Sequence, residues 1–238
     1  MSQKIHFITY GDYNFNNSKK RIKNEAINSG WFDTVNICGP KDLTQEFKTE
    51  FNDILQQKKG AGYWIWKFDI IKQQLDKLKN NDILVYIDAG CTINPYGKKR
   101  FFEYIQMLND SNQTIISFQM PHIEKKYTTK QLFRYFDIDI NSNHGNTGQY
   151  VGGILLMKKS QKIINECIQV LQTDHLLVTD YYNKTNQCDS FIDNRHDQSI
   201  LSLVRKKFGS IVLSDETWFQ PFGNSDSMKF PFWATRKR

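Results

Sequence analysis

The chain has 238 residues, of which 39% are hydrophobic and 24% charged, a composition typical of one soluble globular domain with a substantial core. The formal net charge of +7 is spread along the chain, so it indicates an anionic partner only weakly. No apolar run approaches the roughly 20 residues of a bilayer-spanning helix, and the first apolar run is too short for a signal peptide. We therefore expect a cytoplasmic protein without a transmembrane segment.

The four cysteines, Cys38, Cys91, Cys167 and Cys188, are far apart in the sequence and form no C-x-x-C pair. Neither a zinc site nor a disulfide framework is indicated by this spacing. We predict that all four are reduced thiols.

The first part of the chain predicts a β-α-β unit. Residues 4–10 have the pattern of a strand that ends at Gly11, and residues 17–30 have the apolar spacing of a helix. A second strand over residues 34–38 follows. A strand, a helix and a strand in this order favour a parallel pair joined by a right-handed crossover.

Two helices are predicted next, over residues 43–57 and 63–78, separated by the Gly-Ala-Gly break at residues 60–62. A Gly-x-Gly segment before tryptophans favours a ligand site, because glycines admit close approach and rings stack on bases. Trp66 is explained equally well as part of the core. Lys67 is harder to explain as core.

Residues 81–91 form an apolar, β-branched run that ends in an acid and a glycine, the pattern of a strand buried on both faces. In open α/β sheets, ligands bind outside the carboxyl ends of such strands, where Asp88 would emerge. Ala89 and Gly90 would let a phosphate or sugar approach the backbone. Capping of the following turn explains Asp88 about equally well.

The second half of the sequence predicts further strands and helices. His122 lies in an irregular polar link and is more often a surface histidine than a ligand. A basic tail, residues 230–238, ends the chain. In chain order the pattern predicts a helix over 101–108, a strand over 113–118, a link over 121–127, a helix over 132–136, a glycine-bearing strand over 148–157, a helix over 160–171, a loop over 179–188, a helix opening at 193–198 and a strand over 211–213.

Two places in the second half are candidates for chemistry. Gly152 and Gly153 weaken a strand unless something packs closely against it, so they indicate a bulge or a ligand wall. His196, Asp197 and Gln198 open a helix, where the dipole and an acid can orient a polar ligand. An N-cap role explains Asp197 about equally well.

The segments 85–90, 62–67, 124–133, 148–153 and 196–198, in this order and spacing, resemble the nucleotide-sugar-dependent glycosyltransferases of the GT-A fold. The resemblance covers nearly the whole chain and is greatest to small enzymes from surface-glycan and large-DNA-virus gene sets. It implies an α/β fold, a Rossmann-like three-layer α/β/α sandwich with a mostly parallel central sheet. It also implies one domain, 1–238, with a nucleotide-binding half (1–94) and a sugar- and acceptor-binding half (95–238).

The same resemblance implies an enzyme, a hexosyltransferase-like glycosyltransferase. It would move a sugar from a UDP-sugar, or a GDP-sugar, to a hydroxyl of a glycan or glycoprotein, in the host cytoplasm if the chain is viral. Asp88 and Asp197 would be catalytic. The donor would be bound by Thr9, Tyr10, Gly11, Asp12, Tyr63, Trp66, Lys67, Asp88, Ala89, Gly90 and Arg236, and the sugar or acceptor by Gln149, Gly152, Gly153, His196, Asp197 and Gln198.

One departure from the family pattern concerns the metal. Members commonly carry D-x-D at the end of the central strand, and here the second acid is replaced by Gly90. Asp88 would be the only strand-end acid left to hold Mn²⁺ or Mg²⁺, hard ions that prefer oxygen ligands.

Other interpretations remain open. A noncatalytic nucleotide-sugar-binding domain is consistent with the missing acid. A sugar-nucleotide pyrophosphorylase has a similar sheet, but we find no glycine-rich Arg-Lys loop after the first strand. A nucleic-acid-binding module has no support from a basic stripe or a zinc-finger spacing. The tail would either fold over the donor, with Arg236 on its phosphates, or remain frayed.

Overall fold

A mostly parallel sheet forms the centre of the protein, seen in a computed structural model that describes residues 3–238. Its strand order is β2-β1-β3-β7, with β1 pairing in parallel with both β2 and β3, and β7 antiparallel to β3. These strands are β1 (Ile5–Tyr10), β2 (Thr34–Cys38), β3 (Ile83–Ile87) and β7 (Ile154–Lys158). The predicted β-α-β unit at the start of the chain is confirmed.

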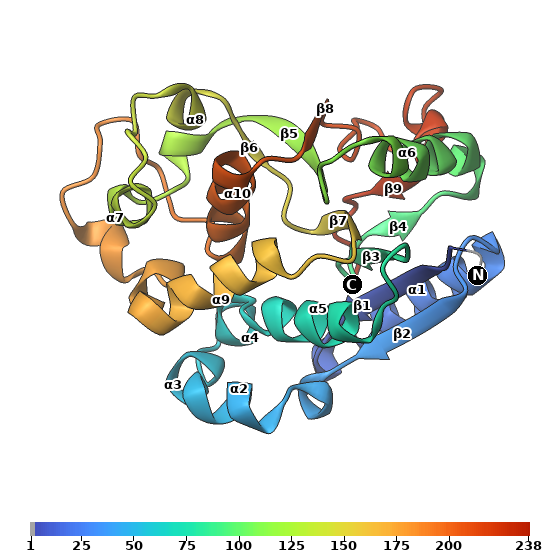
Figure 1. Cartoon of the computed structure of the whole chain (residues 1–238), viewed down its shortest axis with the longest axis horizontal. Helices are drawn as coiled ribbons and strands as arrows, with labels where there is room; N and C mark the ends of the chain where they lie inside the picture. The colour runs from blue at the N-terminus through green and yellow to red at the C-terminus, as the bar shows by residue number, and fades with distance from the viewer. Residues whose placement is uncertain (1–2) are drawn as a thin grey trace.

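A second sheet continues from the first. It has the order β6-β5-β8, and a single bridge between Ile115 and Met157 connects it to β7 (Figure 1). Two further short strands, β4 and β9, pair with each other and attach the chain's last segment to its middle. The bounds are β4 (Thr92–Ile93), β5 (Ile116–Ile123), β6 (Gly148–Tyr150), β8 (Ile211–Ser214) and β9 (Phe232–Trp233).

Helices cover both faces of the central sheet. On one face α5, α9 and α10 lie side by side, while α1 and α6 pack on the other (Figure 1). The α-helices are α1 (Asn16–Ser29), α2 (Gln45–Glu50), α3 (Asn52–Leu55), α4 (Gly60–Tyr63), α5 (Trp66–Lys77), α6 (Lys98–Asp110), α7 (Lys130–Tyr135), α8 (Asn143–Asn146), α9 (Lys162–Asp174) and α10 (Asp197–Phe208). The 3-10 helices are η1 (Tyr13–Phe15), η2 (Pro40–Asp42), η3 (Pro95–Gly97), η4 (Glu124–Lys126), η5 (His175–Val178), η6 (Tyr181–Lys184) and η7 (Ser227–Lys229).

The strand β3 separates two hydrophobic cores. Leu84 and Tyr86 belong to the core beneath α5, α9 and α10, whereas Val85 and Ile87 belong to the core beneath α1 and α6. This division follows from the two-residue period of a strand. It also explains why the sequence of β3 is apolar without alternation. The predicted three-layer α/β/α architecture with a mostly parallel sheet is confirmed, while the division of the chain at residue 94 stays a prediction.

Four predicted elements differ from the structure. The irregular link predicted over 121–127 begins inside a strand, because β5 continues to Ile123 and includes His122. The predicted strand over 148–157 was wrong, because the chain bends at 151–153 and its two ends join different sheets. The helix predicted over 43–57 is divided into α2 and α3 at Phe51, whose φ of −112° and ψ of 26° are not helical. The helix predicted from residue 63 begins at Trp66, because Tyr63 and Trp64 have positive φ angles of 51° and 61°.

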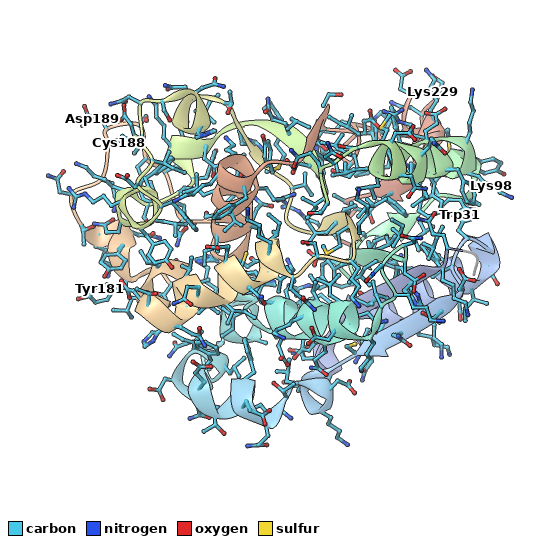
Figure 2. The ribbon with its side chains drawn as sticks, in the orientation of Figure 1. Trp31, Lys98, Tyr181, Cys188, Asp189 and Lys229 are labelled. Carbon is cyan, nitrogen blue, oxygen red and sulfur yellow. The ribbon has the colours of Figure 1, made fainter. Side chains whose placement is uncertain are left out.

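Other predictions agree with the structure. All four cysteines are free thiols. The loop predicted over 179–188 contains only η6, and Figure 2 shows Tyr181, Cys188 and the adjacent Asp189 at the opposite end of the molecule from Trp31 and Lys98. Within residues 3–238, no helix has the length and apolarity that crossing a membrane requires.

Candidate active site at the carboxyl end of the central strand

Lys67 connects the two acids that the sequence singled out. It is the second residue of α5 and is buried, and its Nζ donates to the Gly152 carbonyl at 3.0 Å. The same ammonium is hydrogen-bonded to Asp197 and lies 3.6 Å from Oδ1 of Asp88. Two carboxylates on different elements therefore share one buried cation.

Asp88 follows β3 directly and is the more open of the two acids, with 39% of its side chain exposed. The Tyr86 hydroxyl donates to its carboxylate, and its backbone N–H donates to the Gly153 carbonyl at 2.8 Å. A Cβ on Gly153 would lie 2.5 Å from Oδ2 of Asp88, so any larger residue there would displace this carboxylate. These contacts place the carboxylate in the cluster around Lys67.

Asp197 is the first residue of α10 and is not its N-cap, which is His196 and makes no side-chain capping bond. The N-cap alternative for Asp197 is therefore wrong. Burial raises the pKa of Asp197 to about 6, although Lys67 acts to lower it. For Lys67, burial acts to lower the pKa, but Asp197 and Asp88 outweigh it and leave the pKa raised. At neutral pH both partners are ionised.

Two strained segments precede Lys67 and Asp197. Residues 61–64 form a left-handed turn with φ angles between 49° and 97°, and His196 has a φ of 57°. The rings of Tyr63 and Trp64 pack on His196 at centroid distances of 4.9 and 5.6 Å. Left-handed non-glycine residues cost about 1–2 kcal/mol each and are over-represented at functional sites. The strained segments thus lie shortly before the helical residues Lys67 and Asp197 in the chain.

The predicted nucleotide loop follows β1. The parallel register of Ile8 with Tyr86 brings residues 9–12 alongside Asp88. Thr9 is fully buried, and its hydroxyl has no hydrogen-bond partner within residues 3–238. Tyr10 stacks on Trp66 at a centroid distance of 3.8 Å, and only 5% and 6% of these residues are exposed. Both rings thus belong to the core, the alternative that the sequence left open for Trp66.

The other members of that loop make structural contacts. The backbone N–H of Gly11 donates to the Cys38 carbonyl at 3.2 Å. The Asp12 carboxylate caps η1 by accepting from the Asn14 N–H at 2.8 Å. Their predicted role toward a nucleotide stays a prediction.

The two glutamines predicted near the sugar form a chain of hydrogen bonds. Gln198 accepts from the Gly152 N–H at 3.0 Å and donates to Gln149 at 2.7 Å. Gln149 is fully buried and donates to Glu124 at 3.0 Å. A Cβ on Gly152 would lie 2.9 Å from that of Gln198, so this glycine serves close packing. Gln149 therefore supports the site from behind rather than lining it.

The C-terminal tail is hydrogen-bonded to the strand end. The Gly90 carbonyl accepts from the Lys237 N–H at 2.8 Å and from the Thr235 hydroxyl at 3.0 Å. Ser18 of α1 donates to the Lys237 carbonyl at 3.1 Å. Figure 1 accordingly shows the C-terminus beside β1 and β3. The frayed-tail alternative is wrong, and contact of Arg236 with phosphate stays a prediction.

The groups around Asp88 do not fit a divalent ion held by the protein. Residues 3–238 contain no cluster of three or more His, Cys, Asp or Glu side chains arranged to hold a metal. The Gly90 carbonyl is taken by the tail, and the Ala89 carbonyl accepts from Arg21 at 2.9 Å. Asp88 alone remains, with its carboxylate bonded to Tyr86 and close to Lys67. One shared carboxylate is a poor donor set for Mn²⁺ or Mg²⁺.

Sequence reasoning missed the role of Tyr86. It stands in an apolar run whose pattern predicts only a buried strand, and the structure buries it fully. Its position two residues before Asp88 was a usable signal, because alternate residues of a strand point to the same face. The paired glycines predicted a close contact at Gly153, but the pattern did not identify Asp88 as the group that packs there.

No family model and no curated protein matches the chain. Among solved structures it is similar to a glycosyltransferase involved in the glycosylation of the major capsid of PBCV-1, with a TM-score of 0.53 and 11% identity over 97% of this chain and 91% of that one. It is also similar to mouse xyloside xylosyltransferase 1, with a TM-score of 0.50 and 9% identity over 98% and 94% of the two chains. The chain therefore has the GT-A glycosyltransferase fold that the resemblance predicted.

Proposed function

We propose that this protein is a glycosyltransferase that moves a sugar from a nucleotide diphosphate sugar, a UDP-sugar first and a GDP-sugar second, to a hydroxyl of a glycan or glycoprotein. The observation that carries the proposal is the cluster of Lys67, Asp88 and Asp197 at the carboxyl end of β3. In open α/β sheets this is where ligands bind. The GT-A fold of the chain supports the same assignment.

The roles follow from exposure and charge. Asp88 presents an open carboxylate, which suits hydrogen bonds to ribose or sugar hydroxyls. Asp197 has a pKa of about 6, near the value that suits proton transfer at neutral pH. Lys67 lies between the two carboxylates, bonded to Asp197 and 3.6 Å from Asp88, and so holds both in place. A donor sugar bound at Asp88 would therefore lie next to Asp197 and Lys67, which are held in fixed positions.

A donor-hydrolysis assay tests the proposal. The protein is incubated with UDP-, GDP-, CMP- and ADP-sugars, with and without Mn²⁺, and released nucleotide is measured. We expect turnover of one donor and its loss in Asp88→Asn, with little change in melting temperature because the side chain is partly exposed. The matched control is Asp226→Asn, which removes a carboxylate 74% exposed on the surface.

The outcomes separate the candidate functions. A nucleotide that binds and raises the melting temperature without any turnover would favour a noncatalytic sugar-nucleotide-binding domain. Formation of a nucleotide sugar from a nucleoside triphosphate and a sugar phosphate would instead favour a pyrophosphorylase. Absence of any nucleotide binding would overturn the proposal.

A further inference from the structure

Basic side chains gather where β5 and β8 end, next to the cluster around Lys67. These strands are parallel, with Gln119 opposite Ser214, so the residues that follow them lie at one edge of the sheet. His122 lies near the end of β5, and Trp218 follows β8. The guanidinium of Arg236 lies over the Trp218 ring at 5.7 Å. Arg236 is itself beside Gly90, since its Cα would lie 3.4 Å from a Cβ on that glycine.

A second arginine lies at the same edge. The Arg195 guanidinium stacks over the Tyr127 ring at 3.8 Å, and the His122 ring packs against that tyrosine at 5.5 Å. Arg195 is half-buried and precedes Asp197 by two residues. It therefore belongs to the segment that builds the site.

Neither guanidinium is paired with a carboxylate among the described residues. Within residues 3–238, the side chains of Arg195 and Arg236 make no ion pair and no hydrogen bond of their own, unlike Arg100, which is bonded to Glu216 and Glu103. Burial and then the charge of Arg195 lower the pKa of His122, and burial and Arg236 lower that of Arg195. The nearby acids are otherwise bound: Asp215 to Thr217, Asp193 to Asn183 and Glu124 to Lys206.

We propose that Arg195 and Arg236, with His122 beside them, bind the diphosphate of the donor and supply the positive charge that a second strand-end acid with a divalent ion would otherwise provide. The inference rests on the proposed function for the identity of the ligand. Guanidinium groups bind phosphate oxygens in pairs of parallel hydrogen bonds, and stacking on a ring fixes their planes beforehand. The replacement of the second acid by Gly90 is then explained, because the tail that carries Arg236 occupies the space at that glycine.

The test measures binding by calorimetry, with inorganic pyrophosphate, UDP, GDP and the parent nucleosides as probes, in the presence and absence of EDTA. Arg195→Gln and Arg236→Gln are compared with Arg134→Gln, which removes the same charge from an exposed position on α7. We expect each site variant to weaken nucleoside diphosphate and pyrophosphate binding by about 10- to 100-fold, the range for hydrogen bonds to charged groups. EDTA should leave the wild-type affinity unchanged, and nucleoside binding should be unaffected.

Each outcome supports or overturns one of the two proposals. Loss of nucleoside diphosphate binding on chelation, or affinities of both site variants equal to that of Arg134→Gln, would overturn the arginine site and leave the glycosyltransferase proposal standing. Binding of pyrophosphate through the arginines without binding of any nucleoside diphosphate would overturn the glycosyltransferase proposal and leave the anion site standing. Melting temperatures verify that the variants are folded. We expect little change in them, because neither arginine side chain makes a hydrogen bond within the described residues.

Discussion

Two buried lysine–carboxylate pairs lie in this protein, and their surroundings differ. Lys67 pairs with Asp197, and Lys206 pairs with Glu124 at 3.2 Å. Both lysine side chains are at most 2% exposed. The Glu124 carboxylate also accepts from Thr128, Gln149 and Ser202, so its lone pairs are satisfied inside the protein.

The pair at Lys67 is less enclosed, because a partly exposed second carboxylate lies close to it. Its ammonium also lies 3.6 Å from Asp88, whose side chain is 39% exposed. A buried ion pair contributes little net stability, but loss of one partner leaves a costly uncompensated charge. The comparison indicates that the pair at Glu124 is fully partnered inside the protein, whereas the pair at Lys67 leaves the Asp88 carboxylate open to a ligand.

The largest effect is expected from Lys67→Met. It leaves Asp197 buried and unpaired, so the free energy of unfolding should fall by about 3–5 kcal/mol, measured by urea denaturation. Turnover should be lost as well. The double variant Lys67→Met/Asp197→Leu removes both charges and should recover much of the stability but none of the turnover. A double variant as unstable as the single one would show that the pair is not the source of the loss.

Lys206→Met should have a somewhat smaller effect on stability, about 3 kcal/mol, because Glu124 keeps three neutral donors. The difference from Lys67→Met should appear in turnover per folded molecule, which we expect to remain near that of the wild type. Donor hydrolysis corrected for the folded fraction measures it. A large fall in turnover would contradict this difference between the two pairs.

The smallest effect concerns pH. The pKa of Asp197 is about 6 in the folded chain, and its ordinary value is 3.8. Between pH 3.8 and about 6, Asp197 is therefore protonated in the folded chain but ionised in the unfolded chain. Its stabilising contribution is therefore present below about pH 4 and lost as the pH rises through about 6. Turnover should change in the opposite direction and fall below about pH 6, where Asp197 is protonated. Unfolding and rate profiles of wild type and Asp197→Asn test this, because the amide should abolish both dependences.

The sequence predicted the parts of the site that one segment determines by itself. An apolar run ending in an acid identified β3 and Asp88, and a helix opening at an acid identified Asp197. The contact between Lys67 and Asp197 joins residues 130 positions apart, so it depends on how the strands are ordered. It also depends on the left-handed turn at 61–64, which only Gly62 among those residues favours by its conformational freedom. The bend at 151–153 was missed because its glycines fit a strand bulge as well as a change of sheet.

The hydrogen bonds at Gly90 also bear on how the site is made during translation. The strand end emerges from the ribosome long before its partner Thr235, which follows 145 residues later. At about 5–20 residues per second, the two are synthesised roughly 7 to 30 seconds apart. The nascent chain would thus already contain β1, β3 and Lys67 while the wall that the tail contributes is still missing. Assembly of the complete site is a late event in the life of each molecule.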